Sequence, residues 1–222
     1  TNKGRVLRLK VHQIPEAGRT AKGTAIINLL NITGDEKVSA IIPVKEYDPD
    51  KYLFVATKNG VVKKSSLDAY NSPRKDGLIA VNLDDGDELI GVRLTNGNED
   101  IILATKKGTS ICFAEKDVRP TGRTSRGVKG ITLEKGDEVV GLVVAKPGST
   151  LLVITENGYG KRTKLTEYRT QTRGGKGSRA IAKSSRNGNI VGIMNADEGE
   201  DIIVVSSEGK LIRMPVTSIS VI

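Results

Sequence analysis

The sequence lacks tryptophan and is poor in other aromatic residues, which make up 3% of its 222 residues. A buried core must therefore consist mainly of Ile, Val and Leu. WD40 and kelch propellers normally carry aromatic residues in each repeat, so the lack of Trp argues against both. RNA and single-strand binders stack bases on clustered aromatic side chains, whereas Phe54, Phe113 and the Tyr residues are scattered here, which argues against these binders too.

Cysteine and histidine are represented by one residue each, Cys112 and His12. A single Cys cannot form an internal disulfide, and the two residues provide neither a zinc ligand set nor a basis for a Cys–His nucleophile. We expect Cys112, which lies in an apolar run, to be a small core residue. No set of residues supports catalysis, so we expect no catalytic site, metal or other cofactor in this chain.

Long apolar runs are also missing. None approaches the roughly 18 residues that span a bilayer, and no signal peptide is visible. We therefore expect a cytoplasmic protein.

Two glycine-containing motifs could be mistaken for ligand sites. A phosphate-binding P-loop needs Ser or Thr after its Gly-Lys pair, but Gly177 follows Lys176. Three Gly-Asp-Glu loops carry several carboxylates without the Asp-x-Asp-x-Asp-Gly spacing of a calcium loop. We interpret these loops as acidic hairpin turns.

What the sequence does contain is a repeat. Five versions of one turn, of the form Thr/Ser-x-x-Gly, end at Gly4, Gly60, Gly108, Gly158 and Gly209, at intervals of 56, 48, 50 and 51 residues. A second glycine follows 19, 17, 19 and 19 residues later, at Gly23, Gly77, Gly127 and Gly177. The Gly-Asp-Glu loops close three of the repeats. Three markers in phase, at a period near 50, indicate a repeat architecture.

Each repeat carries four short β-branched runs, clearest at 100–105, 109–113, 127–133 and 138–144. Four strands in about 50 residues are typical of a propeller blade. A β-sandwich would not predict markers that recur in phase. We predict an all-β fold of four-stranded blades around an axis, with single helical turns at 67–70 and 165–168.

The repeat boundaries follow from the markers. We place the repeats at about 1–44, 45–94, 95–144, 145–196 and 197–222, within a single repeat domain, 1–222. The chain opens on a turn and stops after the second strand of the fifth repeat, which predicts 17 strands. This is the pattern of a piece of a longer array.

Charge is unevenly distributed along each repeat. Lys and Arg number 35 against 26 Asp and Glu, a net charge of +9 that favours a polyanionic partner. Basic residues recur four residues after the turn glycine, four residues before the second glycine and next to it, whereas acids recur in the Gly-Asp-Glu loops. Equivalent positions of a repeat array share one face, so we expect a basic outer rim.

The sequence resembles a known family, the C-terminal domain of the DNA gyrase A subunit, over its whole length. The most specific stretches are Thr155-Glu-Asn-Gly-Tyr-Gly-Lys-Arg-Thr163, Gly122-Arg-Thr-Ser-Arg-Gly-Val-Lys-Gly130 and Ile14-Pro-Glu-Ala-Gly-Arg-Thr20. The resemblance implies a six-bladed β-pinwheel, a propeller whose blades exchange strands. It also implies wrapping of double-stranded DNA on the outer rim, which supports ATP-dependent negative supercoiling by the full enzyme. The implied partners, in the bacterial cytoplasm, are the gyrase B subunit, together with the remainder of the gyrase A subunit, two of each.

One motif departs from that family. Its box, Gln-Arg-Arg-Gly-Gly-Lys-Gly, normally lies in the first blade, whereas the matching stretch here lies in the fourth repeat and has Thr172 at the second position. The chain thus looks like blades two to six without the box-bearing blade. The charge pattern and the resemblance together predict these DNA-binding residues: Arg8, Arg19, Lys22, Lys63, Lys64, Arg74, Arg123, Arg126, Lys129, Lys161, Arg162, Gln171, Arg173, Gly174, Gly175, Lys176, Gly177 and Arg213.

Other functions stay open at this point. One is the equivalent domain of topoisomerase IV, which does not wrap DNA for supercoiling. Another is a protein-interaction propeller whose basic rim meets an acidic partner. An RNA binder is a third.

Overall fold

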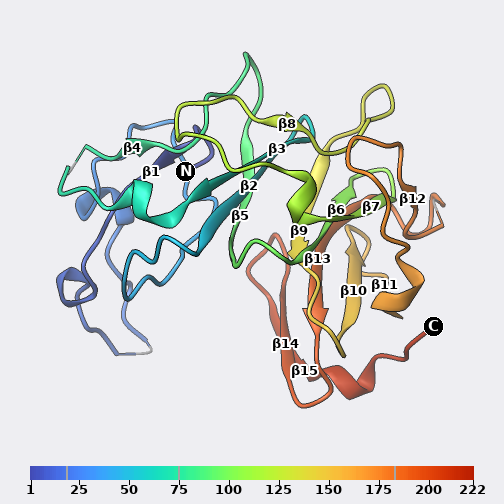
Figure 1. Ribbon diagram of the computed structural model, residues 1–222. Coiled ribbons are helices and arrows are strands. Elements are labelled where there is room, and N and C mark those ends of the chain that lie inside the picture. The colour runs from blue at the N-terminus through green and yellow to red at the C-terminus, as the bar shows by residue number, and fades with distance from the viewer. Residues whose placement is uncertain (19, 75, 183) are drawn as a thin grey trace.

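The computed structural model describes residues 1–222 except 19, 75 and 183, and it is built from β-strands and single 3-10 turns (Figure 1). The all-β prediction is confirmed. Helical turns form at both predicted places, as η3 (Leu67–Tyr70) and η5 (Leu165–Glu167). Within the described residues, no helix is long and apolar enough to cross a membrane.

The strands follow the repeat. They are β1 (Arg5–Val6), β2 (Tyr52–Thr57), β3 (Val61–Ser66), β4 (Leu78–Ile79), β5 (Leu89–Thr95), β6 (Asp100–Thr105), β7 (Thr109–Ala114), β8 (Val128–Lys129), β9 (Val139–Val144), β10 (Thr150–Thr155), β11 (Gly160–Lys164), β12 (Ser178–Arg179), β13 (Ile190–Ala196), β14 (Asp201–Val205) and β15 (Leu211–Pro215). The other 3-10 turns are η1 (Val11–Gln13), η2 (Ile26–Asn28), η4 (Glu115–Asp117) and η6 (Val216–Ser218).

Neighbouring repeats exchange strands. One four-stranded blade has the order β5-β2-β3-β8, in which β8 comes from the following repeat. The next blade has the order β9-β6-β7-β12, and β12 again comes from the following repeat. All these pairings are antiparallel, with Val61 opposite Lys129 in the exchanged pair. The outermost strand of each of these blades is therefore supplied by the next repeat.

Two strands expected in the first repeat are not formed in the described part of the chain, which has 15 strands instead of 17. By the pattern of the later blades, a strand after Gly23 would pair with the second strand of a preceding repeat. A strand near 37–44 would pair with the first strand of its own repeat. Neither partner lies within this chain, and an unpaired strand leaves its backbone N–H and C=O groups without ladder bonds.

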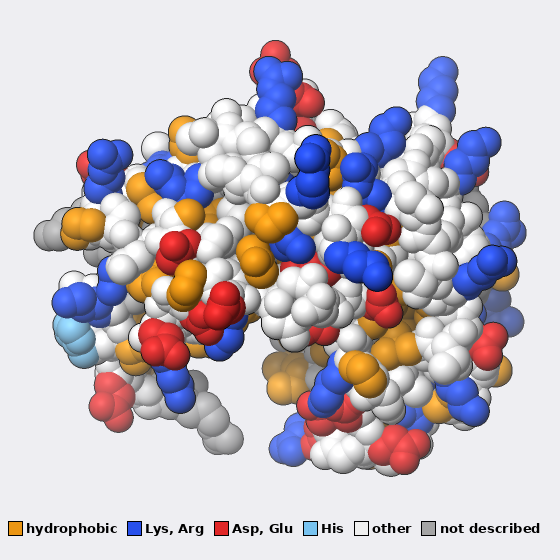
Figure 2. Space-filling model, in the orientation of Figure 1, with side chains coloured by type: hydrophobic (Ala, Val, Ile, Leu, Met, Phe, Trp, Pro, Cys, Tyr) orange, Lys and Arg blue, Asp and Glu red, His pale blue; other side chains and the backbone are white. Residues whose placement is uncertain are grey.

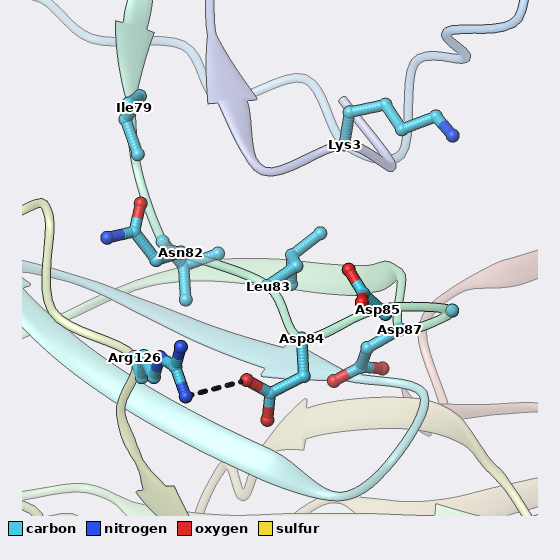
Figure 3. Close-up of a pocket in the computed structure, with 10 residues that line it drawn as sticks. Lys3, Ile79, Asn82, Leu83, Asp84, Asp85, Asp87 and Arg126 are labelled. Atoms are coloured by element: carbon cyan, nitrogen blue, oxygen red, sulfur yellow. Dashed lines mark ion pairs between the residues drawn. The ribbon is translucent and has the colours of Figure 1, made fainter.

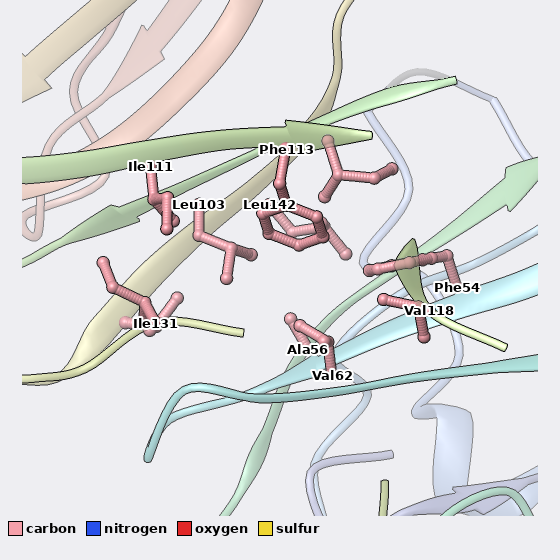
Figure 4. Packing of buried hydrophobic residues seen from close by; sticks show 11 residues of the cluster. Phe54, Ala56, Val62, Leu103, Ile111, Phe113, Val118, Ile131 and Leu142 are labelled. Atoms are coloured by element: carbon pink, nitrogen blue, oxygen red, sulfur yellow. The ribbon is translucent and has the colours of Figure 1, made fainter. Parts of the chain in front are cut away.

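The blades built on β2 and β6 are buried on both faces because each is packed between two others, whereas the hairpin of β14 and β15 is largely exposed. In β2, the alternating side chains of Leu53 and Val55 join one core cluster, and those of Phe54 and Ala56 join the next. The latter cluster includes Ile101 and Phe113 of the following repeat (Figure 4). The inner strands β2, β6 and β10 therefore consist of continuous apolar runs instead of alternating ones, as expected for strands covered on both sides. Cys112 is buried in a third cluster, which confirms its predicted core role.

The two recurring glycines lie at the junctions between blades. Gly60 has a φ of +81°, and a Cβ there would lie 2.9 Å from the Ile131 Cγ2 of the next repeat. Gly127 has a φ of +96°, and its Cβ would lie 2.6 Å from the carbonyl oxygen of Val62. Both positions need positive φ and a close approach of two backbones, which a glycine alone permits. At Gly60 and Gly127 the recurring glycine thus permits the strand exchange.

Candidate nucleic-acid interface

Two loops with the same sequence pattern lie at the outer edge of the blades. We define the rim loops as residues 119–127 of the third repeat and 169–177 of the fourth, each leading into an exchanged outer strand. Each rests on the preceding repeat: the Thr121 N–H donates to the Lys64 carbonyl at 2.8 Å, and the Gln171 N–H donates to the Cys112 carbonyl at 2.8 Å. The blades therefore present these loops in equivalent positions.

An arginine at the same place in each rim loop contacts the preceding outer strand. The Arg173 guanidinium donates to the Lys129 carbonyl at 3.0 Å and to the Asp117 carbonyl at 2.9 Å. Arg123 donates to the Ile79 carbonyl, which occupies the same position one repeat earlier, at 3.3 Å. Both arginines are half-buried. They hold their loops in place as well as adding positive charge to the rim.

Most of the other predicted contacts are at the surface. The exposed ones are Arg8, Lys22, Arg74, Arg126, Lys129, Lys176 and Arg213, and the half-buried ones besides the two arginines are Lys161, Gln171, Gly174, Gly175 and Gly177. Figure 2 shows Lys and Arg side chains gathered over the upper and right-hand parts of one face, where β3, β8 and β12 lie in Figure 1. Arg19 lies outside the described residues.

Three predicted contacts are buried, so their placement on the outer rim is wrong. Lys63 is 1% exposed, and Lys64 and Arg162 are 3% exposed. The two lysines lie on β3, which would be the edge of its blade without strand exchange, but β8 and the rim loop of the next repeat cover it. Arg162 on β11 is covered by the end of the chain, where its Nε donates to the Ile219 carbonyl at 2.7 Å.

The buried lysines have protein partners. The Lys63 ammonium donates to the Ala80 carbonyl at 2.6 Å and to the Arg123 carbonyl. Burial, with a smaller contribution from the nearby Arg123 charge, lowers the pKa of Lys63 to about 8. The Lys64 Nζ lies 3.5 Å from the Glu115 Oε1. These two side chains connect repeats to each other and are not available to a ligand.

The Asp carboxylates of the second and third Gly-Asp-Glu loops hold hairpin turns. Asp87 accepts the Asn59 and Glu88 N–H groups at 2.9 Å, and Asp137 accepts those of Lys107 and Glu138 at the same distance. Within the described residues, no group of three or more His, Cys, Asp or Glu is placed to hold a metal ion. Each Asp caps the turn of its own repeat.

Acids and cations are not completely segregated. A pocket near the first rim loop is lined by Asp84, Asp85 and Asp87 on one side and by Arg126 on another (Figure 3). Arg126 forms an ion pair with Asp84 at 3.2 Å, and both side chains are exposed. A ligand anion at Arg126 would therefore compete with an acid, which sets this cation apart from Lys176 at the same place in the next repeat.

Two exposed basic residues of the rim loops are absent from the predicted contacts. Arg119 and Arg169 begin the two rim loops and are exposed. Each lies 11 residues after its turn glycine, so the repeat period was the signal that could have found them. Counting them, the rim loops carry cations at three matching positions each.

Comparisons with known proteins find similarity along nearly the whole chain. A family model described as the DNA gyrase C-terminal domain, beta-propeller, matches residues 1–45, 51–96, 99–146, 149–197 and 200–222. The chain is 49% identical over 220 residues to the DNA gyrase A subunit of Clostridium acetobutylicum, covering 99% of this chain and 26% of that protein. It is 50% identical over 223 residues to the DNA gyrase A subunit of Staphylococcus epidermidis, covering 99% and 25%. The chain thus spans about a quarter of the length of these relatives.

Two solved structures share the fold. A C-terminal domain of DNA topoisomerase IV superposes with a TM-score of 0.90 at 30% identity, covering 99% of this chain and 69% of that one. A DNA gyrase A C-terminal domain superposes with a TM-score of 0.85 at 28% identity, covering 97% and 70%.

Proposed function

Since the chain belongs to the family of β-propeller C-terminal domains of the DNA gyrase A subunit, within the type IIA topoisomerases, we propose that it binds and bends duplex DNA along its outer rim. The observation that carries the proposal is the matched pair of rim loops. Arg119, Arg123 and Arg126 of one loop correspond to Arg169, Arg173 and Lys176 of the next. Lys129 and Arg179 on the outer strands add charge beside them.

Such an arrangement suits the backbone of a duplex. Cations that recur from blade to blade can meet successive phosphates only if the DNA curves around the domain. Phosphate contacts position a duplex and do not read its sequence. Sequence then matters mainly where it makes bending easier, since curvature of a short site costs on the order of 1–6 kcal/mol.

The burial of three predicted contacts narrows the proposed binding residues. We retain the surface and half-buried members of the predicted set, add Arg119 and Arg169, and leave out Lys63, Lys64 and Arg162. The half-buried arginines then act both as supports of the loops and as part of their charge.

In the whole enzyme, this domain would support ATP-dependent negative supercoiling. DNA cleavage and ATP hydrolysis would belong to the B subunit, together with the other domains of the A subunit, with no catalytic step in this chain. We place this function in the bacterial cytoplasm, at the nucleoid. The five repeats, with the boundaries given above, would act as one domain within the six-bladed array implied by the family.

A second candidate is the role of the equivalent domain of topoisomerase IV. The superposition on that domain, with a TM-score of 0.90, favours it as the alternative. A domain of this kind would bind duplex DNA without wrapping it for supercoiling, so the two candidates differ in the bend they impose.

The test uses a duplex with fluorophores at both ends. Binding should shorten the end-to-end distance, and affinity should fall by about 10³–10⁵ between 50 and 200 mM salt if 6–10 phosphates are contacted. Replacing Lys129, Arg169 and Lys176 with Ala should weaken binding to all duplexes alike and flatten the salt dependence. Replacing the exposed Lys37, Lys45 and Lys51, which lie outside the rim loops, removes the same charge and should do much less.

The results separate the candidates. A bound duplex that stays straight contradicts bending and favours the topoisomerase IV role. Binding of an acidic protein but not of duplex DNA would indicate the protein-interaction alternative instead.

A further inference from the structure

Thr132 contacts the second rim loop from the neighbouring repeat. Its hydroxyl donates to the Gly174 carbonyl at 2.7 Å, and its backbone N–H donates to the Gly175 carbonyl at 2.8 Å. One residue thus holds two successive carbonyls of the loop. The contact joins the third repeat, just after β8, to the most glycine-rich part of the fourth.

The preceding blade has the same arrangement. Asn82 lies five residues after its second glycine, as Thr132 does. The Asn82 side chain donates to the Thr124 carbonyl, and its backbone N–H donates to the Ser125 carbonyl at 3.3 Å. Two different side chains make the same pair of contacts, so the contact belongs to the repeat and is not an accident of one loop.

The contact determines where the loop's donors point. In a trans peptide the C=O and the N–H lie on opposite sides. Because the Gly174 and Gly175 carbonyls point toward Thr132, the N–H groups of Gly175 and Lys176 point away from it. Neither N–H donates to a protein acceptor among the described residues. Two adjacent free N–H groups beside a lysine form the kind of concave donor site that binds anions.

We propose that Thr132 is a positioning residue that fixes the Gly174–Gly175 backbone so that the Gly175 and Lys176 N–H groups face a DNA phosphate. Asn82 holds the first rim loop by the same pair of contacts, but there the Ser125 N–H donates to the Gly122 carbonyl at 3.2 Å, so the proposed phosphate site belongs to the second rim loop. The inference rests on the proposed DNA-binding function and deepens it by assigning part of the interface to a side chain that need not touch DNA. Two successive glycines have many accessible conformations. A loop without the Thr132 contact would therefore be less ordered before binding, and it would lose more conformational entropy when DNA binds.

The test replaces Thr132 with Val, which keeps the β-branched shape and removes the hydroxyl. Losing one hydrogen bond that orders the site should weaken duplex binding about three- to tenfold. Thr132→Ser, which restores the hydroxyl, should recover most of the affinity. Thr150→Val is the matched control, because the Thr150 hydroxyl also donates to a carbonyl, that of Ala196, at 2.8 Å, but between the paired strands β10 and β13, with neither residue in a rim loop.

Two further measurements separate positioning from general loss of structure. Urea unfolding should give similar stabilities for the Thr132→Val and Thr150→Val variants. In amide NMR spectra, Thr132→Val should shift the Gly175 and Lys176 signals, and their response to added duplex should diminish. Combined with Lys176→Ala, the Thr132→Val effect on affinity should be smaller than in the parent chain, because both changes act on one site.

The inference is overturned if Lys176→Ala weakens binding while Thr132→Val leaves affinity and both amide signals unchanged. It is also overturned if Thr150→Val lowers affinity as much as Thr132→Val. If the parent chain binds no duplex at all, the proposed function fails, and the inference fails with it for that separate reason.

Discussion

The Lys64 ammonium lies 3.5 Å from the Glu115 carboxylate, and both side chains are almost completely buried, so an internal ion pair joins the second repeat to the third. Glu115 also accepts the Thr95 hydroxyl at 2.6 Å and the Gly97 and Glu99 N–H groups at 3.1 and 3.2 Å. At the same positions one repeat later stand Cys112 and Leu165, which pack in an apolar cluster. The same junction is thus built once from charges and once from apolar groups.

We predict that the buried ion pair can be replaced by apolar residues only if both of its members are changed together. Glu115→Leu alone should destabilise the chain by about 3–5 kcal/mol, because the Lys64 charge stays buried without its partner. The double variant Lys64→Met with Glu115→Leu should lose much less stability than the single variant. Urea unfolding measures both. Equal losses in the single and double variants would mean that the ion pair is not the source of the effect.

A second prediction compares two turn glycines with similar φ. Gly60→Ala and Gly158→Ala should both strain the backbone, by about 1–3 kcal/mol. Gly60→Ala should cost more, because its Cβ would press on Ile131, whereas the Cβ at Gly158 meets nothing within 4 Å. Thermal or urea unfolding of the two variants provides the comparison, and a larger loss at Gly158 would contradict it.

A third prediction separates a buried arginine from an exposed lysine of the same repeat. Arg162→Ala removes a side chain that is 3% exposed and bonded to the Ile219 carbonyl, and it should cost about 1–3 kcal/mol of stability. Lys176→Ala should change stability by less than about 0.5 kcal/mol and should weaken duplex binding. Unfolding curves and binding isotherms on both variants test this, and unchanged stability in Arg162→Ala would refute it.

A fourth prediction concerns pH. The pKa of Lys63 falls from 10.5 in the unfolded chain to about 8 in the fold. Between these values the unfolded chain binds more protons, so this residue's contribution to the unfolding free energy should rise as pH rises from about 8 to about 10.5. Below pH 8 its penalty is complete. Lys63→Met should lack this rise. The difference between the unfolding free energies of the two chains, measured from pH 7 to 10, should change with pH; parallel curves would contradict the assigned pKa.

Much of the fold could be predicted from the sequence, because its signals are local. The turn glycines, the β-branched runs and the single helical turns all lie within one repeat. The strand exchange could not be read from any one repeat, since Val128 pairs with Val62 of the repeat before it. The predicted third strand, 127–133, shortens to Val128–Lys129 because only two of its residues pair with β3.

The same non-local contact explains the errors at the site. Two adjacent lysines such as Lys63 and Lys64 are typical of an exposed strand. They are buried because a loop about 60 residues further along the chain covers them, as the hydrogen bond from Lys63 to the Arg123 carbonyl shows. Arg119 and Arg169 were missed for a different reason. Their signal lay in the period itself, at a position where the earlier repeats have no cation.

The exchanged strand also has a consequence for synthesis of the protein. The hairpin of a blade leaves the ribosome well before the strand that completes the blade. Val61, for example, can pair with Lys129 only after Lys129 has been synthesised. Each of these blades is therefore completed only when the next repeat has been made as far as its third strand, and until then the growing chain carries one open sheet edge. Such an edge is a hazard for pairing with other chains, so translation speed through each following repeat sets how long that edge is exposed.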